Sequence, residues 1–469
     1  MDSYGRIAAL KIETAQDRAH AVIEEVQRVE NRVYASPGSR NLLSFVSDAA
    51  VKIDVLLENE KALTQTGLLT VSQIETRLHR ITKLIPLLHW MLGFVEGSEV
   101  HRSPAQLIPT LRRYAQSILP DSEIVVRSKP ELNYSIQDIA KPLAELFKGT
   151  PLETSCSKLP DRLFMMSIPG VESGHILIHA VLSHELGHAL YNKKEIAKEL
   201  LPKIGFNENL VKGLVKMMFE NQEKQGNPTP ELRIRKQVTQ EITGRVHGWI
   251  KELCSDAIGI RLFGPALFFA AAHLLTSLRP LDKSSETHPP LRLRTKLMIR
   301  MLKELYTVER WHDELQAFVR LWDEVSGEPI FSTNPYDQIA LETVNDAALD
   351  LISAASDTAT ASLSCYTSSQ FTRDIKVLAP LLLSYIPPGE VGPYGQCGTA
   401  EKLASIINSG WHVYLCDFET FKQNLHPNDA RTRFSAATKL HELVLKALEI
   451  SGIQVAWEEA SRDSKRRKG

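Results

Sequence analysis

Two histidines, His184 and His188, stand four residues apart in the segment S-H-E-L-G-H-A. On an α-helix, residues four apart lie on one face, so both imidazoles can bind a single metal ion. Glu185 follows the first histidine and can point toward a water molecule at that ion. The pattern H-E-x-x-H predicts a zinc hydrolase site with two neutral histidine ligands and a carboxylate as general base.

The residues around this motif favour a helix. The flanks are apolar, and no proline interrupts residues 173–194. Gly187 lies between the histidines, where a small residue lets another element approach closely. The alternative interpretation is a buried helix with incidental histidines.

A third ligand is expected because a catalytic zinc ion usually has three protein ligands and one open position. The best candidate is Glu252, in a segment that reads as a helix over residues 238–262. Asp256 lies four residues later on the same face. It can accept the outer ring N–H of a ligand histidine and so fix its tautomer. The alternative is that both are ordinary solvated helix carboxylates.

The order and spacing of H-E-L-G-H and E-L-C-S-D resemble the gluzincin metallopeptidases. The resemblance implies that His184, His188 and Glu252 bind zinc, that Glu185 is the general base, and that Asp256 is the partner of His184. It also implies a zincin-like catalytic core.

A later segment, T-H-P-P over residues 287–290, is similar to one in the membrane-bound gluzincins that process prenylated or misfolded membrane proteins. In that group the histidine lies near the metal, which implies a role for His288 in access or in stabilising an oxyanion. The alternative for His288 is a polar loop residue. The resemblance covers roughly residues 160–295.

The chain departs from that membrane group because it shows no transmembrane segment. A span needs about 20 consecutive apolar residues. The longest apolar run, residues 263–278, contains Gly264, Pro265 and His273 and reads as a buried helix. The membrane substrates of the group therefore do not carry over.

Composition indicates an ordinary globular protein. The 469 residues are 43% hydrophobic and 24% charged, with a net charge of −1, so no global field attracts nucleic acid or membrane. The first residues do not form a signal peptide. Five cysteines without a C-x-x-C pair indicate reduced thiols, and we expect a cytoplasmic protein.

The predicted fold is mainly α with a small sheet (α+β). We expect a helical region at 1–115, a zincin-like catalytic domain at 116–330, and a mostly helical region with a basic tail at 331–469. In the first region, apolar residues alternate at spacings of four and three, which predicts a helical seam. The seam consists of Ala8, Ile12, Ala15, Ala19, Val22, Val26, Val29 and Val33. It suits an antiparallel bundle within the chain, or an arm that forms a homo- or hetero-oligomer.

Strands are expected at residues 123–127 and 163–168, and a helix at 136–147. In zincin folds the strand before the H-E-x-x-H helix lies at the cleft edge and binds extended substrate by strand addition. Residues 163–168 are therefore expected to be that edge, which favours peptide substrates. Residues 291–325 read as helical and amphipathic, and 411–416 as a short strand.

The leading hypothesis is a zinc metalloendopeptidase that acts on a specific intracellular protein or peptide. Glu185 would take a proton from the attacking water and deliver it to the leaving amine. His288 or Tyr191 would donate to the oxyanion. Two alternatives remain. One is a binding or regulatory protein with a zincin fold and little turnover, which the intact Glu185 argues against. The other is a zinc aminopeptidase, whose G-x-M-E-N motif is absent from the sequence.

Overall fold

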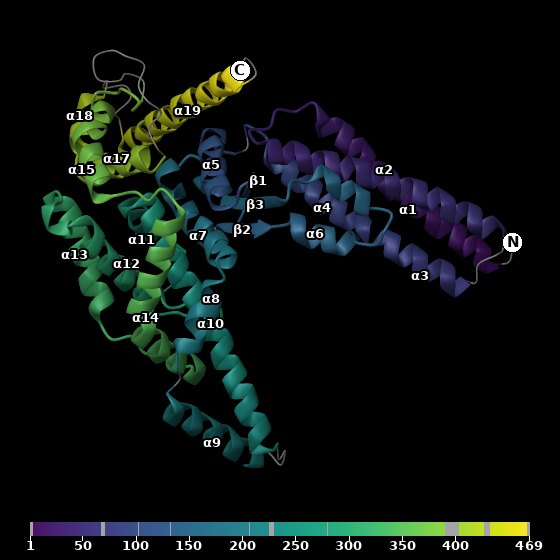
Figure 1. The fold of residues 1–469 in the computed structure, drawn as a ribbon, viewed down its shortest axis with the longest axis horizontal. Helices are drawn as coiled ribbons and strands as arrows, with labels where there is room; N and C mark the ends of the chain where they lie inside the picture. The colour runs from purple at the N-terminus through teal and green to yellow at the C-terminus, as the bar shows by residue number, and fades with distance from the viewer. Residues whose placement is uncertain are drawn as a thin grey trace. The chain divides into compact units, whose positions relative to one another are not determined.

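The computed structural model describes residues 3–66, 71–101, 103–131, 133–205, 207–224, 229–278, 280–389, 403–425 and 432–466. These residues are mainly helical with one three-stranded sheet, which confirms the predicted class (Figure 1). None of the helices in the described ranges combines the length and apolar character that a bilayer crossing needs. Contacts divide the chain into two compact units, Met1–Ser173 and Gly174–Gly469.

The first unit begins with four helices: α1 (Ser3–Glu30), α2 (Pro37–Thr66), α3 (Val71–Thr82) and α4 (Leu84–Gly97). The helix α1 lies along α2 (Figure 1). Seven residues of the predicted seam are buried there: Ala8, Ile12, Ala15, Ala19, Val22, Val26 and Val29. The seam is thus covered by helices of the same chain, as the bundle alternative predicts. Its eighth member, Val33, is 68% exposed because it lies beyond the end of α1.

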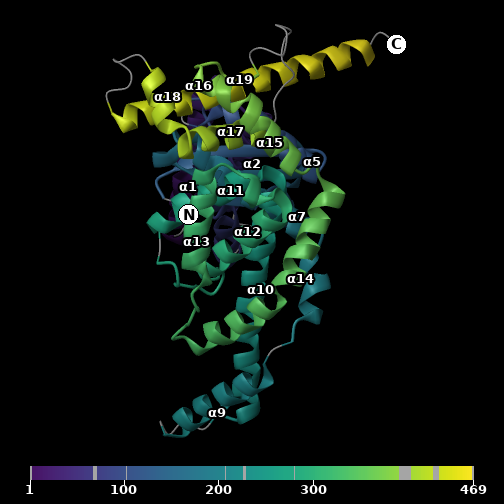
Figure 2. The same cartoon turned by 90° about the vertical axis from the view of Figure 1, so that its left-hand side faces the viewer.

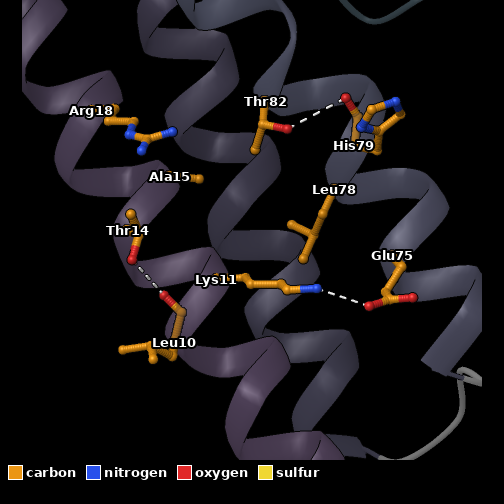
Figure 3. Close-up of a pocket in the computed structure, with 9 residues that line it drawn as sticks. All are labelled: Leu10, Lys11, Thr14, Ala15, Arg18, Glu75, Leu78, His79 and Thr82. Carbon is orange, nitrogen blue, oxygen red and sulfur yellow. Dashed lines mark hydrogen bonds and ion pairs between the residues drawn. The ribbon is translucent and has the colours of Figure 1, made fainter.

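A shallow groove of about 350 Å³ lies between α1 and α3 (Figure 3). Lys11 Nζ and Glu75 Oε1 are 2.8 Å apart across it, and both side chains are more than half exposed. Such exposed pairs contribute little to stability. None of the predicted site residues lines this groove.

The sheet follows in the same unit. The segment runs through α5 (Ile108–Ile118), β1 (Ser122–Lys129), β2 (Ser135–Asp138), α6 (Ala140–Phe147) and β3 (Arg162–Pro169). The strand order is β1-β3-β2, with β3 parallel to β1 and antiparallel to β2. The single helix expected over 136–147 is therefore wrong at its start, where the chain first forms β2.

The strand β3 is the central strand, so the prediction that residues 163–168 form a free cleft edge is wrong. Met166, for example, is paired with Val126 on one side and with Ile136 on the other. β1 lies along the full length of β3 on one side, and β2 pairs with residues 164–167 on the other, so the middle of β3 is closed to an added strand. The uninterrupted apolar run L-F-M-M was the signal for a strand buried on both faces.

One hydrophobic core joins the sheet to the four-helix part of this unit. Val125 of β1, Met165 of β3 and Phe147 of α6 belong to the same buried cluster as Phe45 of α2 and Met91 of α4. The boundary expected at 115/116 falls within the helix α5 of the first unit, and the one expected at 330/331 falls inside the second unit. The contacts therefore place one boundary at 173/174 and none at the two positions expected from the sequence.

The described part of the second unit is helical throughout. Its longer helices are α7 (Leu182–Lys193), α9 (Glu208–Lys224), α10 (Glu231–Phe263), α11 (Pro265–Leu278), α12 (Leu291–Tyr306), α13 (Asp313–Gly327), α14 (Pro335–Ser362), α15 (Ser368–Val377), α17 (Leu403–Leu415) and α19 (Arg433–Arg466). The shorter ones are α8 (Ile196–Leu200), α16 (Ala379–Leu383) and α18 (Phe418–Asn424). The helices α10 and α14 run side by side in both views (Figures 1 and 2).

One local prediction in this unit is wrong. Residues 411–416 lie in and just after the helix α17 instead of a strand. Trp411 and Val413 are both buried, and an apolar run buried on all sides does not show whether it is a helix or a strand. The helical stretch expected over 291–325 is formed by α12 and α13, and Thr307 adopts a left-handed conformation (φ 51°) that ends α12. Residues 467–469 of the predicted basic tail lie outside the described residues.

Candidate metal centre

Two glycines let α7 and α10 approach closely at their crossing. A Cβ built on Gly187 of α7 would lie 2.6 Å from the carbonyl oxygen of Ser255, and one built on Gly259 of α10 would lie 3.1 Å from the backbone nitrogen of His184. A side chain at either position would force the helices apart. The close approach predicted for Gly187 is confirmed, and its partner is the helix that carries Glu252.

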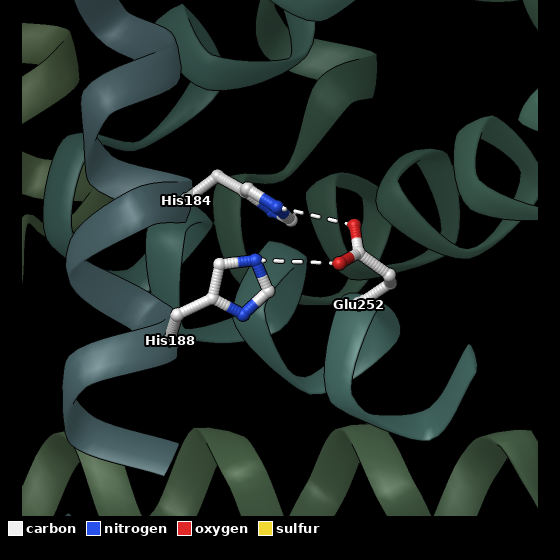
Figure 4. A group of neighbouring side chains, drawn as sticks. All are labelled: His184, His188 and Glu252. Atoms are coloured by element: carbon white, nitrogen blue, oxygen red, sulfur yellow. Dashed lines mark ion pairs between the residues drawn. The ribbon is translucent and has the colours of Figure 1, made fainter. Parts of the chain in front are cut away.

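The crossing brings His184, His188 and Glu252 together (Figure 4). His184 Nε2 lies 3.3 Å from Glu252 Oε2, and His188 Nε2 lies 3.3 Å from Glu252 Oε1. The candidate ligand atoms of the three residues all lie within 4.8 Å of one another. His184 and Glu252 are buried, and His188 is nearly so. The three predicted ligands therefore form a cluster that could hold a metal ion.

The spacing of these atoms fits a small divalent ion. Bonds of about 2.0–2.2 Å at tetrahedral angles place neighbouring donor atoms roughly 3.3–3.6 Å apart. Both nitrogen–oxygen distances on Glu252 are 3.3 Å. The donor set of two imidazoles and one carboxylate is also the set that zinc accepts in hydrolases.

The outer nitrogen of each histidine is fixed by a partner on α10. His184 Nδ1 lies 2.7 Å from Asp256 Oδ1, which confirms the pairing expected for Asp256. His188 Nδ1 lies 2.7 Å from Ser255 Oγ, which donates its own proton to the carbonyl of Lys251. Both partners therefore accept from an Nδ1–H. This arrangement turns the Nε2 atom of each histidine toward Glu252.

A buried arginine, which the sequence analysis missed, completes the network. Arg294 of α12 donates to both oxygens of Asp256 at 2.8 Å, and its Nη1 lies 3.5 Å from Glu252 Oε2. A signal was present in the sequence. Arg294 lies on the stripe of α12 that also carries Leu291 and Met298, where an arginine has to find a buried partner.

These contacts set the charges of the site. Burial alone would lower the pKa of His184, but Asp256 and Glu252 outweigh it and raise that pKa to about 10. Burial opposes ionisation of Glu252, yet hydrogen bonds from His184 and His188 hold its pKa well below the usual range. The pKa of Asp256 is likewise lowered, against burial, by Arg294 and His184. Without a metal, two carboxylates therefore face one imidazolium and one guanidinium.

His288 reaches the edge of this cluster. Its Nε2 lies 3.8 Å from Glu252 Oε2, and its Nδ1 lies 2.8 Å from Thr287 Oγ1. The loop that carries it is held on α10, where Trp249 Nε1 donates to the carbonyl of Ser285 at 2.9 Å and Gly248 leaves room for Thr287. The structure thus brings His288 beside the third ligand, with the imidazole partly exposed.

Glu185 and Tyr191 lie on α7 with the histidine ligands, and both are buried. Burial raises the pKa of the Tyr191 phenol, and the ionisable group acting on it is Cys254, whose thiol faces the carbonyl of Leu351 on α14. The hydroxyl of Tyr191 has no hydrogen-bond partner within the described ranges, and its role as an oxyanion donor stays a prediction. The role of Glu185 as general base stays a prediction.

Comparison with known proteins finds no matching family model, no matching curated protein and no matching solved structure.

Proposed function

We propose that this chain is a zinc-dependent metallopeptidase whose centre is formed by His184, His188 and Glu252. The observation that carries the proposal is the convergence of two Nε2 atoms on the two oxygens of one buried carboxylate, each at 3.3 Å. The fixed ring orientations support it, because both histidines turn Nε2 inward, and this nitrogen binds metal once the ion displaces its proton.

The residues divide the work of hydrolysis between them. A zinc ion held here would polarise the scissile carbonyl and make an attacking water more acidic. Glu185, next to the first ligand in the chain, accepts the proton of that water and passes it to the leaving amine. His288, at the open edge of the cluster, donates to the oxygen on which negative charge develops. Asp256, Ser255 and Arg294 keep the ligands oriented.

The substrate class rests on the resemblance of H-E-L-G-H, E-L-C-S-D and T-H-P-P to gluzincin segments. Strand addition to β3 no longer supports it, because that strand is central in its sheet. We propose a protein or peptide as substrate, and an intracellular location consistent with the unpatterned cysteines.

The experiment begins with the full chain purified and its metal content measured. A library of peptides and a loosely folded protein such as casein are then digested with and without a chelator. We expect about one zinc ion held by His184, His188 and Glu252, and cleavage that the chelator abolishes.

The first prediction concerns the proton-transfer residue. Glu185→Gln keeps the metal and the fold but lowers the cleavage rate by a factor of about 10²–10⁴, the usual contribution of a positioned general base. The matched control is Glu199→Gln on α8, an exposed position outside the cluster, which leaves the rate unchanged. Equal rates in the wild type and Glu185→Gln would refute the assignment. Stoichiometric zinc without any cleavage would favour the regulatory alternative.

A further inference from the structure

The second unit holds another group of ligand-type side chains, where the start of α13 meets the end of α17. His312 directly precedes α13, Glu314 lies in its first turn, and Cys416 directly follows α17. Their candidate ligand atoms lie within 4.8 Å of one another, and His312 Nδ1 contacts Glu314 Oε2. The proposed peptidase centre uses none of these residues.

The sulfur of Cys416 has a donor aimed at it. The backbone N–H of Leu315, in the first turn of α13, hydrogen-bonds to the thiol of Cys416. First-turn N–H groups have no acceptor within their own helix, and a donor of this kind stabilises negative charge on sulfur. Burial and the carboxylates of Asp417 and Glu314 nevertheless hold the pKa of Cys416 above its usual range, so the thiolate forms here when a cation takes the place of the thiol proton.

Two further groups flank the three. The ring of His412 lies 5.7 Å from that of His312, and its Nε2 lies 3.2 Å from Asp417 Oδ2. His412 is buried, and its Nδ1 has no hydrogen-bond partner within the described ranges. The carboxylates of Asp417 and Glu314 both raise the pKa of the Cys416 thiol. The junction thus gathers two imidazoles, two carboxylates and a thiol.

We propose that His312, Glu314 and Cys416 form a second metal site, which takes a zinc-class divalent transition ion. A simple ion pair between His312 and Glu314 would need no thiol, whereas thiolate, imidazole and carboxylate together are a ligand set for zinc. Calcium and magnesium prefer oxygen ligands only. His312 and Glu314 are exposed, so an ion reaches the site from solvent. The ion ties the residue before α13 to the end of α17.

Cobalt substitution tests the proposal, because a thiolate bound to Co²⁺ gives a charge-transfer band in the near ultraviolet. The centre of His184, His188 and Glu252 contains no sulfur and gives no such band. We expect the band when the metal-stripped full chain is titrated with Co²⁺, and we expect it to persist in His188→Ala. It should disappear in Cys416→Ser, shift or weaken in His312→Ala, and remain in the control Cys156→Ser.

A second measurement needs no variant. Zinc should slow alkylation of Cys416 at least tenfold, as followed by peptide mass mapping, and a chelator should restore the rate. Cys156, in the other unit, serves as the internal reference. Three results would overturn the proposal: no cobalt band in the wild type, a band that remains in Cys416→Ser, or an alkylation rate of Cys416 that zinc does not change. Loss of peptidase activity alone leaves all three results unchanged, so the two proposals fail independently.

Discussion

His184 and His188 have hydrogen-bond partners on α10 that fix their rings, whereas His312 lies exposed at the surface with its Nδ1 on the exposed Glu314. In the first cluster, Asp256 and Ser255 hold the outer nitrogens, and Arg294 in turn holds Asp256. In the second, the histidine and the carboxylate are exposed and contact each other directly. The two clusters represent two kinds of metal site. In the first, the side chains are held in position before an ion binds, and in the second the ion itself would bring them together.

Removing a residue that holds a ligand of the first cluster should lower the free energy of unfolding strongly. Removing one from the second, exposed cluster should lower it only slightly. Asp256→Ala leaves Arg294 buried without its bidentate partner, which should cost about 3–5 kcal/mol in the free energy of unfolding. Asp417→Ala at the second cluster removes one hydrogen bond to the buried imidazole of His412, whose pKa is lowered by burial, and should cost about 1 kcal/mol. Denaturant unfolding of the metal-free chain measures both. Equal losses would erase the distinction.

The next effect in size is on pH dependence. The folded pKa of His184 is about 10 and its ordinary value is about 6.5, so a protonated His184 stabilises the metal-free fold fully below pH 6.5. That contribution falls as pH rises from 6.5 and is lost above about 10. Thermal unfolding of the chelated protein at pH 7, 8 and 9 should show the decline. Zinc displaces the proton, so the loaded protein should show a flatter profile. A rising midpoint in the chelated protein would contradict the assignment.

The glycine at the helix crossing gives the third prediction. Gly187→Ala places a Cβ against the backbone of Ser255 and should destabilise the fold by about 1–3 kcal/mol while lowering zinc affinity. Gly213→Ala on α9 is the matched control. Its Cβ meets open space, and it should stabilise the chain by about 0.5–1 kcal/mol through helix propensity. If both variants behave alike, the close approach of α7 and α10 is not what forms the cluster.

The smallest effect concerns the hydroxyl behind His188. Ser255→Ala removes the acceptor of Nδ1–H and should weaken zinc binding by about tenfold, the lower end of the range for such partners. Ser183→Ala, next to His184 but bonded only to the carbonyl of Ala180, should leave the affinity unchanged. Competition with a chromogenic chelator measures both constants. An unchanged zinc affinity in Ser255→Ala would mean that Ser255 does not fix the tautomer of His188.

The sequence predicted the cluster better than the architecture around it. The proposed ligands and Asp256 were recognised from spacings of four residues within two helices. Residues at this spacing share a helix face however the rest of the chain is arranged. The position of β3 depends on which strands pair, and that is decided by contacts between segments far apart in sequence. Ser255 and Arg294 were missed because a partner is recognised only once the helix crossing is known. The seam of α1 was right up to its end, beyond which Val33 follows no helical rule.

The pairing of two acidic with two basic groups in the proposed peptidase centre has a consequence for how the protein matures. Asp256 and Glu252 are neutralised by Arg294 and a protonated His184 before any ion is present. Folding can therefore run to completion first, with loading as a late exchange of one proton for one cation. Stripping and refilling should then be repeatable without unfolding, and the supply of zinc, as well as synthesis of the chain, would decide when hydrolysis begins.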